Sequence, residues 1–260
     1  DEDVLKQTSD KRLPLGTLGV TRDGRKFRYT RNGAVALTVG SVIQSMAVAS
    51  ATPQTTATIA DNYWAVAPTT NSSSVKVRFL STKAMMGSTI NYWADGWIYI
   101  RTGTGVGQML RILSHGAATT TALAGHVVNI AWDSRLSAAG ATSTANRIGI
   151  MQNLYSRVVV SPAAASTAKT GKALGVAPRA ITIGYYFWLQ TGGLCVAKRE
   201  GTVTRGIPVS PSTNTAGYIV KRLVATTFNT TQVVRETIGH VVHAGSTAEG
   251  HSAVVYLTID

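Results

Sequence analysis

The chain has 260 residues, of which 44% are hydrophobic and only 14% are charged. This length accommodates one large β domain or two small ones with a buried core. The frequent β-branched residues exclude a disordered chain, and no apolar run reaches the roughly 20 residues that a membrane-spanning helix requires.

The formal net charge is +13, from 25 Lys and Arg against 12 Asp and Glu. Such an excess favours an anionic partner, which is either nucleic acid, a membrane surface or an acidic protein. Beyond residue 31 the basic residues are scattered, and no array of alternating aromatic and basic side chains is evident. We therefore expect an acidic protein partner and no membrane contact. Direct binding of nucleic acid is not expected, but a DNA-binding protein that uses the basic hairpin within residues 11–31 remains an open alternative. The acidic N-terminus does not resemble a signal peptide, so synthesis in a cytoplasm is expected.

The first 31 residues predict an arm followed by a hairpin. Residues 1–12 are polar and of mixed charge, as in a flexible arm. A tight turn is predicted at Asp23-Gly24, and basic and apolar residues alternate after it, so a hairpin is expected from Thr17 to Tyr29. The basic side chains of this region are the candidates for contact with an acidic partner: Arg22, Arg25, Lys26, Arg28 and Arg31.

The rest of the chain reads as many short strands. The apolar segment 34–50 contains Gly40 and several β-branched residues, which favour strands over a helix. From residue 59 onward, strand-like runs such as Val75–Phe79 and Trp97–Arg101 alternate with turn residues. This pattern predicts an all-β, mainly antiparallel fold of sandwich or barrel type.

The domain boundary is predicted from composition. Residues 161–172 form the clearest low-complexity segment, rich in Ala, Ser, Thr and Lys. This segment divides the chain into residues 13–160 and 173–260. These parts are either two β domains or one continuous domain, because a long loop between strands would have the same composition.

Few residues are candidates for chemistry. A single cysteine, Cys195, excludes an intramolecular disulfide, and its apolar surroundings predict a small buried side chain. His240 and His243 have a spacing that could bind a metal on a helix, but their surroundings predict a strand, where positions i and i+3 point to opposite faces. No metal or cofactor site is therefore predicted.

The acidic residues are scarce, far apart and mostly beside turn residues, where capping a turn is their expected role. The stretch Gly103–Gly107 resembles a phosphate-binding loop, but the residues after it read as extended, so a turn or bulge is expected. We therefore expect no catalytic residues. A hydrolase that uses His115 or His240 with a distant acid remains an open alternative.

The tryptophans have two possible structural roles. Trp side chains either fill the core of a β domain or act as exposed anchors at a protein or sugar interface. The aromatic segments Tyr92–Trp97 and Tyr185–Trp188 are dense enough that some rings are expected at the surface. The chain contains five tryptophans, Trp64, Trp93, Trp97, Trp132 and Trp188.

Several motifs also carry a resemblance to a known family. The first is Leu15-Gly16 followed by Asp23–Tyr29, with an apolar stretch that closes on Gly40 and Gln44. Later matches are Gly105–Gln108, Arg111–His115, Asn153–Tyr155, Gly175–Ala177 and Tyr186–Gly193. Over nearly all of residues 14–260, the chain resembles capsid decoration, or cement, proteins of tailed bacteriophages, which are encoded beside the major capsid protein.

The resemblance implies a virion structural protein on the outside of the capsid. It implies the major capsid protein as partner and a small homo-oligomer, with a trimer favoured. No catalytic residues come with this family. The alternative within the virion is a tail, neck or receptor-binding component, whose exposed aromatic side chains would bind a host glycan.

Overall fold

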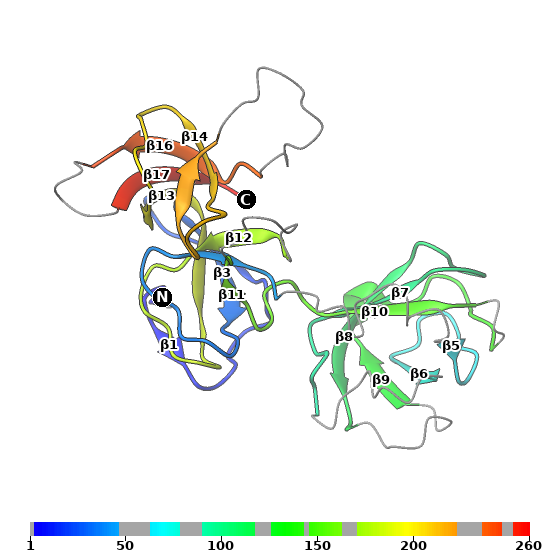
Figure 1. The fold of residues 1–260 in the computed structure, drawn as a ribbon. Coiled ribbons are helices and arrows are strands. Elements are labelled where there is room, and N and C mark those ends of the chain that lie inside the picture. Colours follow the sequence, from blue (N-terminus) through cyan, green and yellow to red (C-terminus); the bar gives the residue numbers. More distant parts are fainter. Residues whose placement is uncertain are drawn as a thin grey trace, which may run out of the picture. The chain divides into compact units, whose positions relative to one another are not determined.

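In a computed structural model, two compact units form separate β structures (Figure 1). Unit 1 comprises Asp1–Ala47 and Leu154–Asp260, and unit 2 comprises Val48–Asn153. Every strand pairing among the described residues is antiparallel, which confirms the predicted all-β fold. The structure describes residues 3–46, 63–78, 90–117, 126–142, 146–162, 171–222, 236–245 and 252–260.

Unit 1 contains one 11-stranded sheet with the main order β11-β4-β12-β13-β17-β16-β14-β15. Three further strands lie beside this path, where β1 and β3 pair with β13, and β2 pairs with β3. The strands are β1 (Gln7–Thr8), β2 (Leu18–Val20), β3 (Lys26–Arg31), β4 (Val42–Gln44), β11 (Val159–Val160), β12 (Ala173–Val176), β13 (Tyr186–Lys198), β14 (Pro208–Pro211), β15 (Ile219–Lys221), β16 (Gly239–His243) and β17 (Ser252–Thr258).

Strand β13 changes partner along its length. Its first part pairs with β3 as far as Gly192, and its last part pairs with β17 from Gly192 onward. The register shifts between Gln190 and Gly192, and Gly193 has a φ of +78°. A bulge with glycine in this conformation bends a strand, because other residues adopt positive φ at a cost. The bend allows one strand to contribute to two parts of the sheet.

The two parts of β13 also differ in burial. All positions from Phe187 to Gly193 are buried, whereas exposed and buried positions alternate from Leu194 onward. Cys195 and Ala197 point into a core formed with β16 and β17, while Leu194 and Val196 lie on the opposite, exposed face. The last part of β13 is therefore covered on one face only.

Unit 2 contains a six-stranded sheet in the order β10-β7-β8-β9-β6-β5. Alternate side chains of β7 and β10 enter its core, where the buried rings of Trp64 and Trp93 pack against them. A short 3-10 turn, Trp132–Ser134, is the only helical element in the described part of the chain. The strands are β5 (Tyr63–Trp64), β6 (Ser74–Arg78), β7 (Trp97–Ile100), β8 (Met109–His115), β9 (His126–Ile130) and β10 (Ile148–Met151).

The division between the units differs from the boundary predicted at residues 161–172. Strands β11 and β12, which lie on either side of that segment, both pair with β4 of unit 1. Unit 2 is instead inserted after β4 and before β11. A low-complexity composition marks a loop, but it carries no information on whether the flanking strands share a sheet.

The N-terminal region combines the predicted hairpin with a docked segment. Strands β2 and β3 pair around Asp23-Gly24, which confirms the hairpin. Within the segment predicted as a flexible arm, Gln7 and Thr8 form β1 and pair with β13. The described part of the arm therefore packs on its own chain, and residues 1–2 lie outside the described residues.

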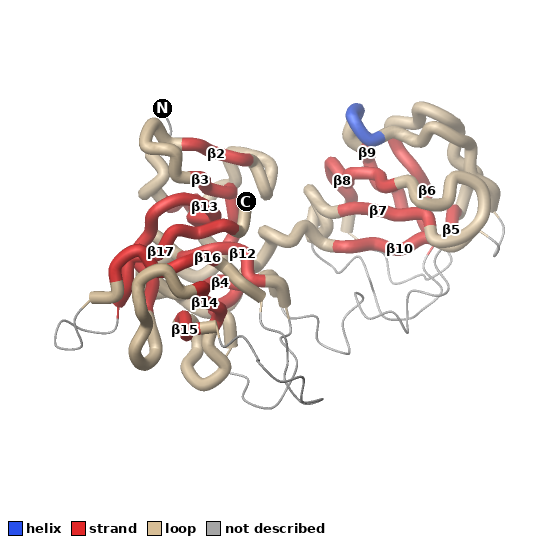
Figure 2. Tube along the Cα trace, turned by 90° about the horizontal axis from the view of Figure 1, so that it is seen from above, coloured by secondary structure: helices blue, strands red, loops and turns tan. Residues whose placement is uncertain are grey.

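No helix in the described ranges is long and apolar enough to cross a membrane. Figure 2 shows both units built of strands joined by loops, with β2, β3, β13 and β17 in succession in unit 1.

The bend in β13 is testable by substitution. A Cβ at Gly193 would lie 3.1 Å from the Cα of Arg25, in addition to the strain of its positive φ. We expect Gly193→Ala to lower the free energy of unfolding by roughly 2–3 kcal/mol, measured by urea denaturation. The matched control is Gly201→Ala, because Gly201 also has positive φ but has open space around it. Equal destabilisation by the two substitutions would contradict a special role of the bend.

Candidate functional site

His115, one of the two histidines considered for catalysis, has a structural role. His115 is buried, and its Nε2 accepts a hydrogen bond from the Trp93 amide at 3.0 Å. Its Nδ1 lies 2.6 Å from the carbonyl oxygen of Gly116, so the tautomer with the proton on Nδ1 satisfies both contacts. His115 thus fastens the turn at residues 90–96 to β8, and both ring nitrogens have backbone partners.

Cys195 is buried, as predicted, on the inner face of β13. Burial raises the pKa of its thiol to about 12. Because the thiolate is the nucleophilic form, this thiol is unreactive near neutral pH.

The two histidines of β16 do not point to opposite faces, contrary to the prediction. His240 pairs with Tyr256 and His243 pairs with Val254, and these partners are two residues apart on β17. The register shifts between Val241 and His243, so a bulge adds one residue and brings both histidines to the same face. No group of three metal-binding side chains occurs in the part of the chain that the structure describes, and His251 lies outside it.

Several of the described acidic residues close turns or bind main-chain amides. Asp23 accepts a hydrogen bond from Thr21 and pairs with Arg25, and the Thr21 contact lowers its pKa. Glu200 binds the hydroxyl of Ser212 and the amide group of Asn214. Asp61 and Glu249 lie outside the described residues.

The glycine stretch at residues 103–107 forms a turn between β7 and β8, as expected. Gly103, Gly105 and Gly107 all have positive φ. The amide of Thr104 is bound by the side chain of Asn146 at 2.8 Å, so that part of the turn is held within unit 2.

The predicted contact residues of the basic hairpin differ in accessibility. Arg22 and Arg31 are exposed, whereas Arg25 is partly buried and pairs with Asp23. The guanidinium of Arg31 lies over the ring of Tyr186, 5.4 Å from its centroid. The ammonium of Lys26 donates to the carbonyl oxygen of Asp260.

Arg28 forms a bidentate ion pair with Asp260. Nε of Arg28 lies 2.7 Å from Oδ2 of Asp260, and Nη2 lies 3.2 Å from Oδ1. These hydrogen bonds lower the pKa of the Asp260 carboxyl and raise the pKa of Arg28. Such forked contacts are the strongest type of charge-assisted hydrogen bond. Arg28 therefore joins β3 to the segment after β17. The sequence alone did not predict this contact, because the two residues are 232 positions apart.

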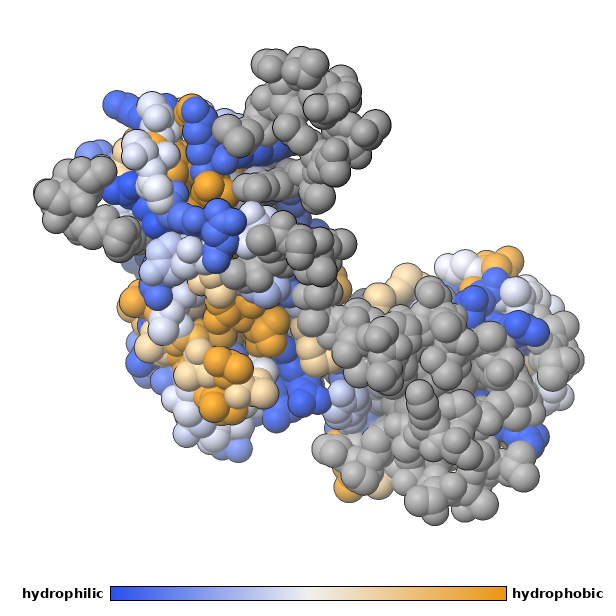
Figure 3. All heavy atoms as spheres, viewed as in Figure 1, coloured by the Kyte–Doolittle hydropathy of each residue, from blue (hydrophilic) through white to orange (hydrophobic). Residues whose placement is uncertain are grey.

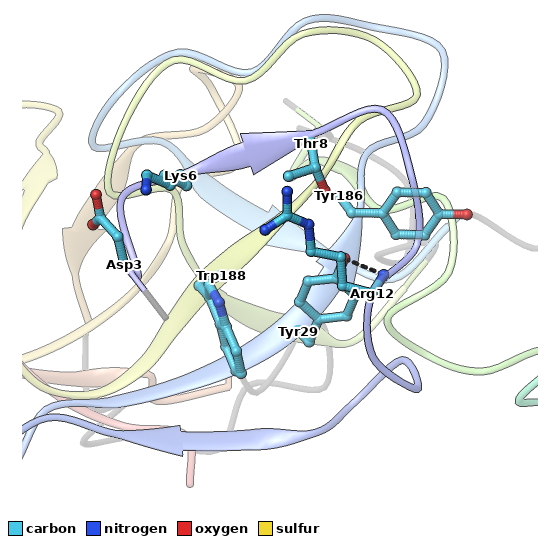
Figure 4. A pocket seen from close by; sticks show the side chains of 7 residues that line it. All are labelled: Asp3, Lys6, Thr8, Arg12, Tyr29, Tyr186 and Trp188. Carbon is cyan, nitrogen blue, oxygen red and sulfur yellow. Dashed lines mark hydrogen bonds between the residues drawn. The ribbon is translucent and has the colours of Figure 1, made fainter. Parts of the chain in front are cut away.

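A pocket beside β1 is lined by aromatic and charged side chains (Figure 4). The ring of Tyr29 is stacked on Tyr186 and meets Trp188 edge-on, with centroid distances of 5.9 and 5.4 Å. The amide of Arg12 donates to the hydroxyl of Tyr29 at 3.0 Å, and Val4 packs against the same cluster. These rings therefore hold the N-terminal segment; Tyr29 and Trp188 are buried, and Tyr186 is half-buried beneath the guanidinium of Arg31.

The outer face of β13, β17 and β16 is apolar and accessible. Tyr256 and Leu194 are directly paired and are 51% and 50% exposed, and Val196 is 58% exposed. None of the three strands contains an acidic residue, and the face is bordered by Lys198, His240 and His243. Val39 and Tyr218 line a shallow pocket with Val196 and Lys198 and extend this surface. We call this surface the β13–β17 face.

Apolar surface occurs elsewhere on unit 1 as well. Figure 3 shows an apolar area around the positions that Figure 1 labels β3 and β11. Val35 and Ile183 are also exposed, on neighbouring loops joined by the bond from the amide of Gly184 to the carbonyl of Gly33. Exposed apolar area beyond a few isolated side chains is typical of interaction surfaces.

The sequence did not distinguish core aromatics from exposed ones. Trp64, Trp93 and Trp188 are buried, Trp97 is half-buried, and Trp132 is 80% exposed. The alternation in residues 97–101 could have predicted that Trp97 lies on the face of the sheet away from the core residue Ile98, because successive residues of a strand point to opposite faces.

In comparisons with known proteins, no family model, no curated protein and no solved structure matches the chain.

The ion pair between Arg28 and Asp260 predicts acid sensitivity. The carboxyl has a lower pKa in the folded state than the ordinary value of about 3.9. Its stabilising contribution is therefore present above that value and is lost as pH falls through the lower folded value. We expect Asp260→Asn to lower the free energy of unfolding by roughly 0.5–1 kcal/mol at pH 7. The difference from the parent chain should shrink as pH falls below the ordinary value of the carboxyl, and a difference independent of pH would contradict the ion pair as its cause.

Proposed function

We propose that this chain is a structural protein that binds the outside of a tailed-bacteriophage capsid and stabilises the shell. The observation that carries the proposal is the β13–β17 face. Apolar side chains there lie on the outer side of strands whose inner side forms the core of unit 1. Such a face gains free energy when a partner covers it.

The charge of the chain indicates what the partner should be. The β13–β17 face is bordered by Lys198 and two histidines, and the whole chain carries a net charge of +13. A partner with an apolar patch bordered by acidic residues would complement this surface. In the proposal, the partner is the major capsid protein, and exposed Arg22 and Arg31 of the basic hairpin are additional contact candidates.

The proposed activity is mechanical. A protein that binds only the expanded shell stabilises that state by mass action. Many copies at symmetry-related positions, bound as small homo-oligomers, add further stability even when each interface is modest.

The direct test is the copy number in purified phage particles, measured by quantitative mass spectrometry against the major capsid protein. We expect an abundance comparable to that of the capsid protein. A few copies per particle would favour the alternative of a tail, neck or receptor-binding component. Absence from the particle would reject both proposals.

The role of the β13–β17 face is testable by matched substitutions. Val196→Lys places a charge at the centre of the proposed interface, and we expect at least about ten-fold weaker co-sedimentation with capsid shells. Val127→Lys is the control, because Val127 is a strand residue of unit 2 with similar exposure. Its side chain is 48% exposed, and that of Val196 is 58% exposed. Unchanged binding of the Val196 variant would show that another surface makes the contact.

A further inference from the structure

The outer face of the unit 2 sheet brings aromatic and basic side chains together. Across β10, β7 and β8, Met151 pairs with Trp97 and Trp97 with Arg111. In the next row on this face, Gly149 pairs with Tyr99 and Tyr99 with Met109. Paired residues of antiparallel strands share a face, and so do alternate residues of one strand. The residues between them enter the core: Ile98, Ile100, Leu110, Ile112, Ile148 and Ile150.

The two aromatic rings are placed for stacking. Trp97 and Tyr99 are half-buried on the same strand and two residues apart, which separates them by about 7 Å along β7. A Cβ at Gly149 would lie 2.2 Å from Cζ of Tyr99, so the tyrosine ring leans across this glycine. Any larger residue at position 149 would displace the ring. The glycine therefore allows Tyr99 to lie along the sheet.

Basic residues extend the same face. Arg101 continues the alternation of Trp97 and Tyr99, and its amide donates to the carbonyl of Arg147 at 2.8 Å. Arg111 lies opposite Trp97 and pairs with exposed Asp133 at 3.3 Å. The other acidic residue in the described part of unit 2, Asp95, is buried. The accessible charge of this face is therefore mainly positive.

A third aromatic residue lies next to Arg111. The amide of Ala131 donates to the carbonyl of Arg111 at 2.9 Å, and the amide of Arg111 donates to Oγ of Ser134 at 2.7 Å. These bonds hold the 3-10 turn against β8, and Trp132 in that turn is 80% exposed. A tryptophan this accessible contributes little to the core of unit 2 and is available to a partner.

We propose that this face, formed by β10, β7, β8 and the 3-10 turn, binds single-stranded nucleic acid. Bases would stack on Trp97, Tyr99 and Trp132, and the phosphates would contact the arginines. Aromatic platforms bordered by cations bind unpaired strands without sequence preference, because every base has a flat π face. Bases of a duplex are stacked on one another and cannot use such a platform.

The inference goes beyond the proposed capsid role and does not depend on it, because the two surfaces lie in different units. It also departs from the expectation that the chain does not bind nucleic acid directly. Arg111 lies on a different strand from Trp97 and Tyr99, and Arg147 is far from them in the sequence, so the array exists only once β10, β7 and β8 are paired.

The test is fluorescence anisotropy of a labelled 20-nucleotide oligothymidine with the full chain at 50 and 200 mM NaCl. We expect binding that weakens several-fold at the higher salt, because phosphate contacts release counterions. Tyr99→Thr and Trp132→Ala should each weaken binding about ten-fold. Arg101→Ala should reduce the magnitude of the slope of log affinity against log salt by about 1, the value for the loss of one phosphate contact.

Matched controls come from unit 1. Tyr256→Thr removes a half-exposed strand tyrosine and Arg205→Ala removes an exposed arginine, and neither should change binding. Because Trp132 is so exposed, its variant tests the proposal even if the Tyr99 variant fails to fold.

Three results would overturn the proposal. The first is no binding of the oligonucleotide at 50 mM NaCl. The second is equal binding by the Trp132 and Tyr256 variants, which would show that the net charge of the chain, and not stacking on Trp132, causes the binding. The third is binding of a sulfated polysaccharide that depends on Trp132 while oligothymidine does not bind, which would assign the face to an anionic glycan.

Discussion

The bend in β13 is the constraint on which unit 1 depends. A register shift before Gly192 and the positive φ of Gly193 let one strand pair with β3 and then with β17. Before the bend the strand is buried on both sides, and after it only Cys195 and Ala197 face the core. The same feature that joins the parts of the sheet thus leaves Leu194 and Val196 uncovered. The core of unit 1 and its proposed interface are two faces of the same strands.

The insertion of unit 2 is compatible with this sheet because of where it occurs. The chain leaves unit 1 after β4 and returns before β11, and these two strands pair with each other. An insertion between neighbouring strands preserves the pairing of the parent sheet, since the two ends of the insertion are already close. Each unit then has its own core and its own outer face. The face of unit 1 is apolar with Lys198 at its border, whereas that of unit 2 combines aromatic rings with arginines.

The positive charge of the chain is not all available to partners. Arg28 is engaged by its bidentate bond to Asp260. The number of basic residues in the hairpin therefore overstates how many of them can contact an acidic partner. Arg25 is likewise paired with Asp23, while Arg22 and Arg31 remain exposed. In unit 2, Arg111 lies in β8, Arg101 follows β7 and Arg147 precedes β10, so only the pairing of these strands brings the three together. Pairing within the chain therefore decides which of these charges are available to a partner.

The sequence alone determined the β class, the hairpin around Asp23-Gly24, the turn at residues 103–107 and the burial of Cys195. Each of these follows from local alternation or from a turn residue, whose preferences act over a few neighbouring positions. Tertiary structure decided the insertion of unit 2, the shared face of His240 and His243, and the array around Trp97. A one-residue bulge reverses the face of every later side chain, and strand partners are set by contacts between distant segments. Local patterns carry neither kind of information, because they do not record which strands become neighbours.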